Sequence, residues 1–209
     1  MDNFYILTTW SPYLLSGIAL NLLIAILATI IGSLTGAILI WFSYSRIKII
    51  RWFGTIIPNI IGAVPSLFLL FYLAILLPNE IIINSGEIVI SLPNWLKAAI
   101  ALAASPLAFT SRSLREAIKH WNAGNRNEAL LFIPNLTNGF IITLLASSGS
   151  SLVGVNEIVS RTNNLIKTIG TEYAILLYSY AGLIFVISAF LISLIVRYLR
   201  NSINPAVAL

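Results

Sequence analysis

Long apolar stretches without charged residues run through most of this 209-residue chain. Four of them reach or exceed the ~20 residues that a helix needs to cross a ~30 Å hydrocarbon layer. They lie at Asn3–Ser45, Trp52–Asn79, Ala129–Asn156 and Tyr173–Val196. A fifth stretch, Ala98–Ser111, reaches crossing length if residues 95–97 form its interfacial end, with the Lys97 ammonium extended to water. A re-entrant hairpin and a buried half-helix are the alternatives for that fifth stretch.

This pattern predicts an all-α membrane protein, a bundle of five transmembrane helices. No fixed-period repeat, low-complexity tract or polar linker marks a second domain, so we expect one transmembrane domain over residues 1–209. The approximate spans are 13–42, 52–78, 95–112, 129–156 and 173–197, and a hydrophilic segment at 112–128 follows the third of them. An odd number of crossings puts the two termini on opposite sides of the membrane.

Composition supports the membrane class and excludes several kinds of site. Hydrophobic residues make up 58% of the chain and charged residues 9%, whereas soluble domains are about a quarter charged. The absence of cysteine excludes disulfides and cysteine-ligated metals, and the single histidine, His120, leaves no cluster for zinc. No acid, base and nucleophile converge in the pattern as an active site requires. We therefore do not expect an enzyme.

The basic residues are distributed unevenly between the two sides of the five-span arrangement. One side carries nine of the twelve: Arg46, Lys48, Arg51, Arg112, Arg115, Lys119, Arg126, Arg197 and Arg200. The other carries Lys97, Arg161 and Lys167 with the acids Asp2, Glu80, Glu87, Glu157 and Glu172. The positive-inside rule then predicts an external amino terminus and a cytoplasmic carboxy terminus. The net charge of +5 reflects topology and is no nucleic-acid footprint. Because no basic residue precedes the first apolar run, we expect that helix to be retained, not cleaved as a signal peptide.

Proline and glycine positions predict bent and closely packed helices. Pro58, Pro65, Pro106 and Pro134 fall inside or at the ends of spans. Each removes a backbone donor and bends a helix, which suits a conduit better than a simple anchor. Gly32 and Gly36 form a small-xxx-small spacing that favours close helix contact, either within the subunit or in a dimer.

Three polar segments remain open in conformation or role. The external segment 79–94 alternates turn residues with short apolar runs, which is compatible with a small helix or a hairpin. The cytoplasmic segment 112–127 is the longest hydrophilic one, so a soluble partner would dock there. In the fourth span, SSGSS (Ser147–Ser151) places four hydroxyls among apolar residues. Those hydroxyls either bond the carbonyls of their own helix or line a path for a polar solute.

The order of these features resembles the membrane subunits of bacterial ATP-binding-cassette (ABC) importers for polar amino acids. The stretch LLSGIALNLLIAILATIIGSLTGAIL is similar to the family's first helix, with Gly17 and Gly36 at matching places. IGAVPSLFLLFYLAILLP, residues 61–78, is similar to a span bounded by two prolines, although the arginine usual before the first of them is absent. The resemblance covers nearly the whole chain and implies a type I importer permease fold.

The fourth span carries the most specific part of this resemblance. The family shows an asparagine, an apolar run, a Lys-x-Thr-Ser element, a glycine and a glutamate. The chain matches with Asn138, Phe140, Ile141, Ser148, Ser151, Gly154 and Glu157. Leu145 replaces the lysine and Ser147 the threonine, so charge-based contacts to the solute do not carry over. The resemblance implies a substrate path that includes Asn138, Ser147, Ser148, Ser151 and Glu157.

The cytoplasmic segment resembles the family's coupling loop only in part. Phe109 and Arg115 match, Arg112 replaces an acid, Gly124-Asn125 stands for Gly-Gln, and Asn127-Glu128-Ala129 stands for Glu-Ala-Ala. The amphipathic coupling helix that should follow is missing, because LLFIP leads directly into the fourth span. The resemblance assigns ATPase coupling to Arg115, Trp121, Gly124, Asn125, Glu128 and Ala129.

The remaining hydrophilic residues leave the fate of that coupling open. Leu114, Ile118 and Trp121 recur at helical spacing within Leu114–Asn127. This segment is an abbreviated coupling helix or an amphipathic helix on the membrane surface. If it is the latter, the subunit does not couple to an ATPase at all.

The resemblance implies a transmembrane subunit of an importer for a polar amino acid or similar small solute in the bacterial cytoplasmic (inner) membrane. Its partners would be ABC ATPase subunits, a second permease subunit and an extracytoplasmic solute-binding protein. We expect the second permease subunit to be a different chain and not a copy. The chain itself would bind no cofactor, since the partner ATPase hydrolyses the ATP. One alternative is a degenerate, non-transporting permease that serves as an assembly or regulatory subunit, and another is a passive channel.

Overall fold

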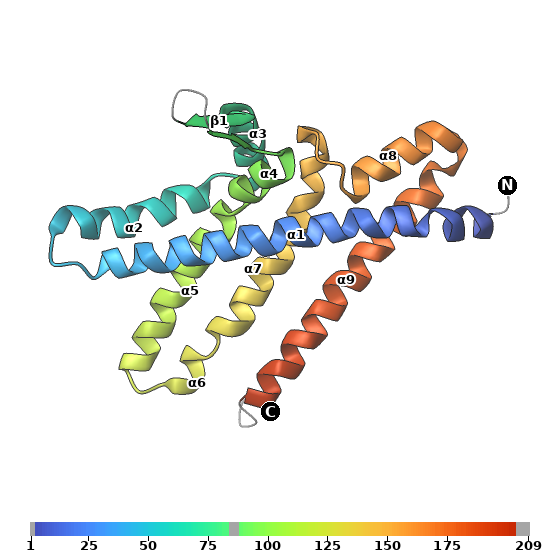
Figure 1. Cartoon of the computed structure of the whole chain (residues 1–209). Coiled ribbons are helices and arrows are strands. Elements are labelled where there is room, and N and C mark those ends of the chain that lie inside the picture. Colours follow the sequence, from blue (N-terminus) through green and yellow to red (C-terminus); the bar gives the residue numbers. More distant parts are fainter. Residues whose placement is uncertain (1–2, 84–87, 204–209) are drawn as a thin grey trace.

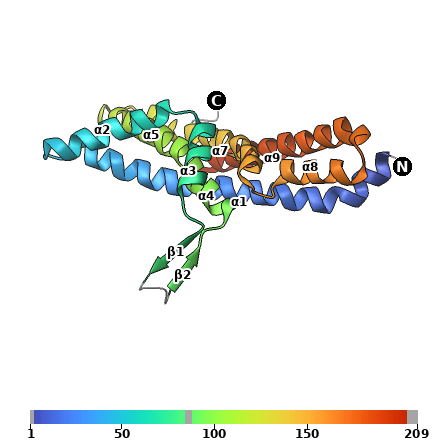
Figure 2. The same cartoon turned by 90° about the horizontal axis from the view of Figure 1, so that it is seen from above.

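The computed structural model describes residues 3–83 and 88–203. Asp2, Glu87 and the side chain of Arg200, which entered the charge distribution, lie outside what is described. The elements, in chain order, are α1 (Asn3–Ser43), α2 (Lys48–Ala63), α3 (Ser66–Leu76), β1 (Glu80–Ile83), β2 (Ile88–Ser91), α4 (Asn94–Leu102), α5 (Ala104–Asn122), α6 (Arg126–Ala129), α7 (Phe132–Ser147), η2 (Ser148–Val153), α8 (Ile158–Ile169), η3 (Thr171–Tyr173) and α9 (Ala174–Ile203). The helices form a flat layer in which α5, α7 and α9 run obliquely across α1 (Figures 1 and 2).

The first helix, α1, contributes to the packing along the whole layer. At 1.5 Å per residue, the 41 residues of α1 are about 60 Å long, about twice the thickness of a hydrocarbon layer. The described residues form three apolar clusters, and α1 contributes a buried side chain to each of them. These side chains are Ile24, Leu14 and Ile6. The layer is therefore assembled on one long helix that extends beyond the predicted span 13–42 at its amino end.

Gly32 and Gly36 bring α1 and α5 into direct backbone contact. A Cβ added to Gly32 would lie 2.3 Å from the carbonyl oxygen of Ala103, and one added to Gly36 would lie 2.7 Å from that of Leu107. The Ser111 hydroxyl also donates to the Gly36 carbonyl oxygen at 3.1 Å. The small-xxx-small spacing thus serves packing within the subunit, the first of the two interpretations.

The predicted span 52–78 is not one continuous helix. It divides into α2 and α3, whose axes differ by 101°. Val64, at the break, has an extended backbone (φ −85°, ψ 129°). The cause is Pro65, the next residue, because a proline disfavours the helical conformation of the residue before it and removes a backbone donor. Pro58 lies inside α2 and leaves it helical. Of the two prolines in this stretch, only Pro65 interrupts the helix.

Lys97 does not extend to water as the sequence suggested. Its side chain is 3% exposed and its ammonium donates to the Leu77 carbonyl oxygen at 2.9 Å and the Asn79 Oδ1 at 2.6 Å. The bend at Pro65 brings the carboxyl end of α3 beside α4, where free carbonyls and the negative end of the helix dipole attract a cation. The segment around the predicted span 95–112 comprises α4 and α5, with α5 continuing to Asn122.

The last two predicted spans differ in how well they match the helices. Residues 174–197 of the predicted span 173–197 lie in α9, which continues to Ile203. The span 129–156 contains α7, which ends at Ser147 and continues as the six-residue 3-10 helix η2. Within the described residues, three helices are long and apolar enough to cross a membrane, Asn3–Ser43, Arg126–Val153 and Thr171–Tyr198, and α2 with α3 counts as a fourth if the bent pair is one span.

The segment 79–94, which the sequence predicts to be external, contains a pair of strands. Strands β1 and β2 pair antiparallel with Ile81 opposite Ile90 and Ile82 opposite Val89, and Figure 2 shows the pair projecting from the helical layer. Of the two conformations compatible with the sequence, β-branched residues in both strands favour this one. Residues 84–87, between the strands, lie outside the described ranges.

Candidate functional site

The serine-rich stretch lies where α7 ends. The hydroxyls of Ser147, Ser148, Ser150 and Ser151 donate to the carbonyl oxygens three residues earlier, at 2.6, 2.7, 2.6 and 3.0 Å. Such bonds satisfy the donors without water. Ser147 and Ser150 are buried, whereas Ser148 and Ser151 are partly exposed. Only the latter two present hydroxyl oxygens that a solute could reach.

Ser147 belongs to a buried polar junction that it forms with Asn21 and Glu157. The Asn21 amide of α1 donates to the Ser147 Oγ at 2.9 Å and to the Glu157 Oε2 at 3.0 Å. Its oxygen accepts from the Ile158 amide at 3.2 Å. All three side chains of the junction are fully buried. A buried polar group costs free energy unless it is bonded, so these mutual bonds fix α1, α7 and α8 relative to one another.

Glu157 caps the amino end of α8. Its Oε1 accepts from the Ser160 amide at 2.9 Å and its Oε2 from the Val159 amide at 3.1 Å. A carboxylate in this position satisfies free amides and complements the helix dipole. Glu157 lies outside the candidate membrane-spanning helices, and burial raises the pKa of its carboxyl, an effect that the bonds from Ser160, Val159 and Asn21 oppose.

A turn at Gly154 places Glu157 within hydrogen-bonding distance of Asn21. Gly154 has φ of +82°, its amide donates to the Ser151 carbonyl oxygen at 3.2 Å, and the Val155 amide donates to that of Ser150 at 3.1 Å. This pair of bonds is a Schellman motif, which requires the left-handed conformation that glycine adopts without a Cβ penalty. The glycine of the fourth-span pattern therefore reverses the chain so that α8 packs on α1.

Arg161 forms a second set of contacts between the first turn of α8 and α1, in addition to those of Asn21. Its guanidinium donates to the Tyr13 carbonyl oxygen at 2.9 Å, to the Ser16 Oγ and, through Nε, to the Asn156 carbonyl oxygen at 2.9 Å. The same group lies 4.9 Å from the centre of the Tyr13 ring, a cation–π distance. The cation predicted on the external side is thus part of the α1–α8 contact.

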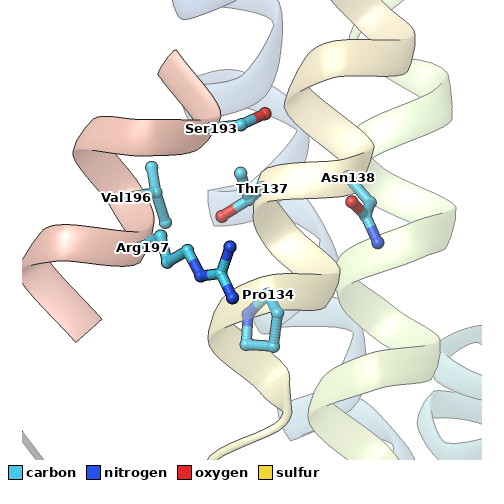
Figure 3. A pocket seen from close by; sticks show the side chains of 6 residues that line it. All are labelled: Pro134, Thr137, Asn138, Ser193, Val196 and Arg197. Carbon is cyan, nitrogen blue, oxygen red and sulfur yellow. The ribbon is translucent and has the colours of Figure 1, made fainter. Parts of the chain in front are cut away.

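Asn138 lies apart from the serines. Nine residues separate it from Ser147 along α7, which is roughly 13 Å at helical rise. Asn138 is exposed and lines a cavity between α7 and α9, which is formed by Pro134, Thr137, Asn138, Ser193, Val196 and Arg197. In Figure 3 the Arg197 side chain reaches from α9 towards α7, while the Asn138 amide points away from it. The predicted path residues therefore fall into two groups.

Four of the six predicted coupling residues lie at the end of the α5–α6 hairpin: Trp121, Gly124, Asn125 and Glu128. We call residues 120–128 the α5–α6 tip. Gly124 has φ of +82°, its amide donates to the Trp121 carbonyl oxygen at 3.1 Å, and the Asn125 amide donates to that of His120 at 2.9 Å. This is a second Schellman motif. The segment 112–128 is consequently the last turns of α5, a turn and the four-residue α6, not one amphipathic helix.

Two side-chain contacts hold the tip together. His120 Nδ1 lies 2.6 Å from Glu128 Oε2, and the Arg126 guanidinium lies 5.4 Å from the centre of the Trp121 ring. Residues 121–128 are all exposed, and the Trp121 side chain is 58% exposed. One turn earlier on α5, Lys119 bonds Glu116 and lowers the pKa of that carboxyl. Arg115 is partly exposed on α5, and Ala129 is buried behind the tip.

Comparisons with known proteins match the chain over nearly its whole length. The glutamate/aspartate import permease protein GltK of Escherichia coli O6:H1 is 24% identical over 210 aligned residues, which cover 91% of this chain and 93% of that protein. The protein of that name from Escherichia coli O157:H7 matches equally. The chain is homologous to an amino-acid import permease. No family model matches it.

The fold agrees with that homology. A chain of the crystal structure of an amino acid ABC transporter with histidines superposes with a TM-score of 0.75, covering 97% of this chain and 99% of that one at 19% identity. The chain therefore has the fold of that amino acid ABC transporter chain.

Sequence reasoning missed Asn21 and Arg161 as members of the site. Asn21 stands alone in the apolar run LLSGIALNLLIAILATIIG, and a lone amide inside a candidate membrane helix is itself a signal, since such groups are costly unless paired. Its partners lie 126 and 136 residues away in the chain. The presence of a partner could thus have been predicted, but not which residue it is.

Proposed function

We propose that the chain is a transmembrane subunit of an ATP-dependent importer for a polar amino acid. The homology to an import permease, with more than nine-tenths of both chains aligned, is the observation that carries this proposal. The fold shared with an amino acid ABC transporter chain supports it. In this proposal an ATPase subunit binds on the cytoplasmic side, an external binding protein delivers the solute, and a second permease subunit completes the path. The chain itself moves a solute and catalyses no reaction.

The proposed topology has five crossings: α1, the bent pair α2–α3, α4 with α5, α7 with η2, and α9. The amino terminus is external and the carboxy terminus cytoplasmic. Figure 1 supports this arrangement, because α6 and the carboxyl end of α9 lie at the same side of the layer while α8 and the amino end of α1 lie at the other. The α5–α6 tip then faces the cytoplasm.

The tip is the proposed contact with the ATPase. Coupling requires packed contact between two bodies, so the contacting segment has to be exposed in the free subunit and rigid enough to transmit motion. Residues 121–128 of the tip are exposed, and the His120–Glu128 and Arg126–Trp121 contacts hold it together. Four residues of α6 offer less surface than a full coupling helix, so the second permease subunit would supply the larger contact.

The test is purification of the full chain from its native membrane, followed by measurement of ATP hydrolysis by the complex in vesicles. We expect an ATPase subunit to copurify and Glu128→Lys to reduce solute-stimulated hydrolysis at least about fivefold. Glu172→Lys, an equal charge reversal at an exposed residue of η3, is the matched control and leaves hydrolysis unchanged. A well-folded chain that brings no ATPase with it contradicts the proposal.

The small α6 also favours a second candidate, a non-transporting subunit that supports assembly of the importer. In that case substitution of Ser148 leaves solute uptake unchanged, while substitutions on the outer surface of the bundle abolish assembly. Solute uptake and complex assembly, measured on the same variants, separate the two functions. A passive channel would instead pass solute in vesicles that contain this chain alone.

A further inference from the structure

The turn between α1 and α2 concentrates cations and aromatic rings on one exposed corner. We call residues 41–53 the α1–α2 corner. Its cations are Arg46, Lys48 and Arg51, all of them exposed. None takes part in any function assigned above, and the corner lies at the far left of the layer in Figure 1, away from the α5–α6 tip.

No acidic group offsets this charge. The chain has no aspartate or glutamate between residues 3 and 79. Throughout residues 3–83 and 88–203, the ion pairs present involve Lys119 and His120, and no carboxylate lies within 4.0 Å of a cation of the corner. Three neighbouring positive charges without partners repel one another and favour an anionic ligand.

Aromatic rings and a cavity lie beside these cations. The side chains of Trp41, Tyr44 and Trp52 are 73%, 57% and 55% exposed. A cavity beneath them is lined by Trp41, Phe42, Tyr44, Ser45 and Ile50. Tryptophan and tyrosine favour the headgroup level of a bilayer, where an apolar ring and a polar edge are both solvated. The apolar wall of the cavity suits an acyl chain, and the cations beside it suit a phosphate.

We propose that the α1–α2 corner binds an anionic phospholipid, with Arg46, Lys48 and Arg51 around the headgroup phosphate and the rings of Trp41 and Tyr44 against the glycerol and upper acyl region. The chemistry decides between possible occupants. A soluble anion would use the cations and leave the exposed rings unpaired. A phospholipid satisfies both, and basic residues near an anionic bilayer surface are attracted to it individually.

This lipid contact has a mechanical consequence. The corner joins α1, on which the whole layer is built, to α2, which leads into the bend at Pro65. A lipid held at the corner fixes the depth and tilt of α1 in the bilayer. This inference does not depend on which solute the protein carries or on its coupling to an ATPase.

The test uses the full chain reconstituted in vesicles of equal phosphatidylglycerol and phosphatidylcholine, with the retained lipids counted by native mass spectrometry after extraction. We expect phosphatidylglycerol to be retained preferentially. The triple variant Arg46→Gln/Lys48→Gln/Arg51→Gln should lower that preference on the order of tenfold. The charge-preserving triple variant Arg46→Lys/Lys48→Arg/Arg51→Lys should keep it.

A second triple variant removes the same net charge elsewhere. Arg126→Gln/Lys167→Gln/Arg197→Gln changes three other exposed cations and should retain the preference. Equal loss in both glutamine variants would reveal attraction by net charge alone and overturn the proposal, as would a wild-type chain without lipid preference. If the corner triple variant does not fold, the single change Arg51→Gln, expected to weaken the preference about threefold, decides the question.

Discussion

The buried polar junction and the α5–α6 tip are built with the same local device and put to opposite uses. Each includes or adjoins a Schellman turn at a glycine with φ of +82°, Gly154 beside the junction and Gly124 within the tip. At the junction, Asn21, Ser147 and Glu157 satisfy one another within the chain. At the tip, residues 121–128 stay exposed. The contrast separates a contact that holds the subunit together from an exposed surface that we propose as the contact with a partner.

Loss of the junction should have the largest effect. Glu157→Ala removes the cap of α8 and leaves an Asn21 donor buried without an acceptor, which should cost about 3 kcal/mol. Asn21→Leu leaves the Glu157 carboxylate with fewer donors and should cost a similar amount. The thermal midpoint of the purified full chain in detergent measures both. Midpoints equal to that of the wild type would show that the junction bonds do not hold α8 in place.

The double variant Asn21→Leu/Glu157→Leu sharpens this result. Replacing both partners removes the unsatisfied groups, so the double variant should be less destabilised than the sum of the single ones. Additive losses would mean that the two side chains act independently, in conflict with the 3.0 Å bond between them.

Alanine substitutions at the two turn glycines, Gly154 and Gly124, should have the next largest effect on stability, and the effect should differ between the two regions. Alanine in the left-handed conformation costs about 1 kcal/mol at either position. A Cβ at Gly154 would also lie 2.9 Å from the Asn94 Nδ2, whereas nothing lies within 4 Å of one at Gly124. Gly154→Ala should therefore lower the thermal midpoint more than Gly124→Ala. The opposite ranking would mean that the tip is the more tightly packed of the two turns.

Ser148→Ala should hardly change stability, within about 0.5 kcal/mol, because its hydroxyl bonds only its own helix at a partly exposed position. Its effect on solute uptake is the informative measurement. If Ser148 lines the path, uptake falls at least about fivefold. Ser150→Ala, at the buried neighbour with an analogous bond, is the comparison and should act on stability instead.

The smallest change in stability is expected at the tip. His120→Gln removes the exposed His120–Glu128 pair and should change the free energy of unfolding by less than about 0.5 kcal/mol. The thermal midpoint of the purified chain measures this change. If the pair transmits motion to an ATPase, ATP hydrolysis by the complex becomes less dependent on solute. A variant that loses stability but keeps coupled hydrolysis would reverse the roles that we assign to the two regions.

Much of the fold could be predicted from local pattern, because apolar runs of crossing length have few alternatives to helix formation. Residues 13–42 lie inside α1, which begins at Asn3, and residues 174–197 lie inside α9, which continues to Ile203. In the sequence Gly124 and Gly154 are only matches to a family motif, and the turns that they form were not predicted. The 101° angle between α2 and α3 could not be predicted. Pro65 signals a break, but the angle depends on what each half packs against.

The sequence by itself determined that this is a membrane protein with uneven basic charge, since those properties follow from composition and spacing, and its motifs resemble those of a known import-permease family. Only the tertiary structure decided that Lys97 is buried, that the Ser147 hydroxyl meets Asn21, and that Glu157 caps α8 instead of standing free. The reason is physical. A polar group in an apolar layer has to find a partner, and the residue that becomes its partner is selected by how helices more than a hundred residues apart pack together.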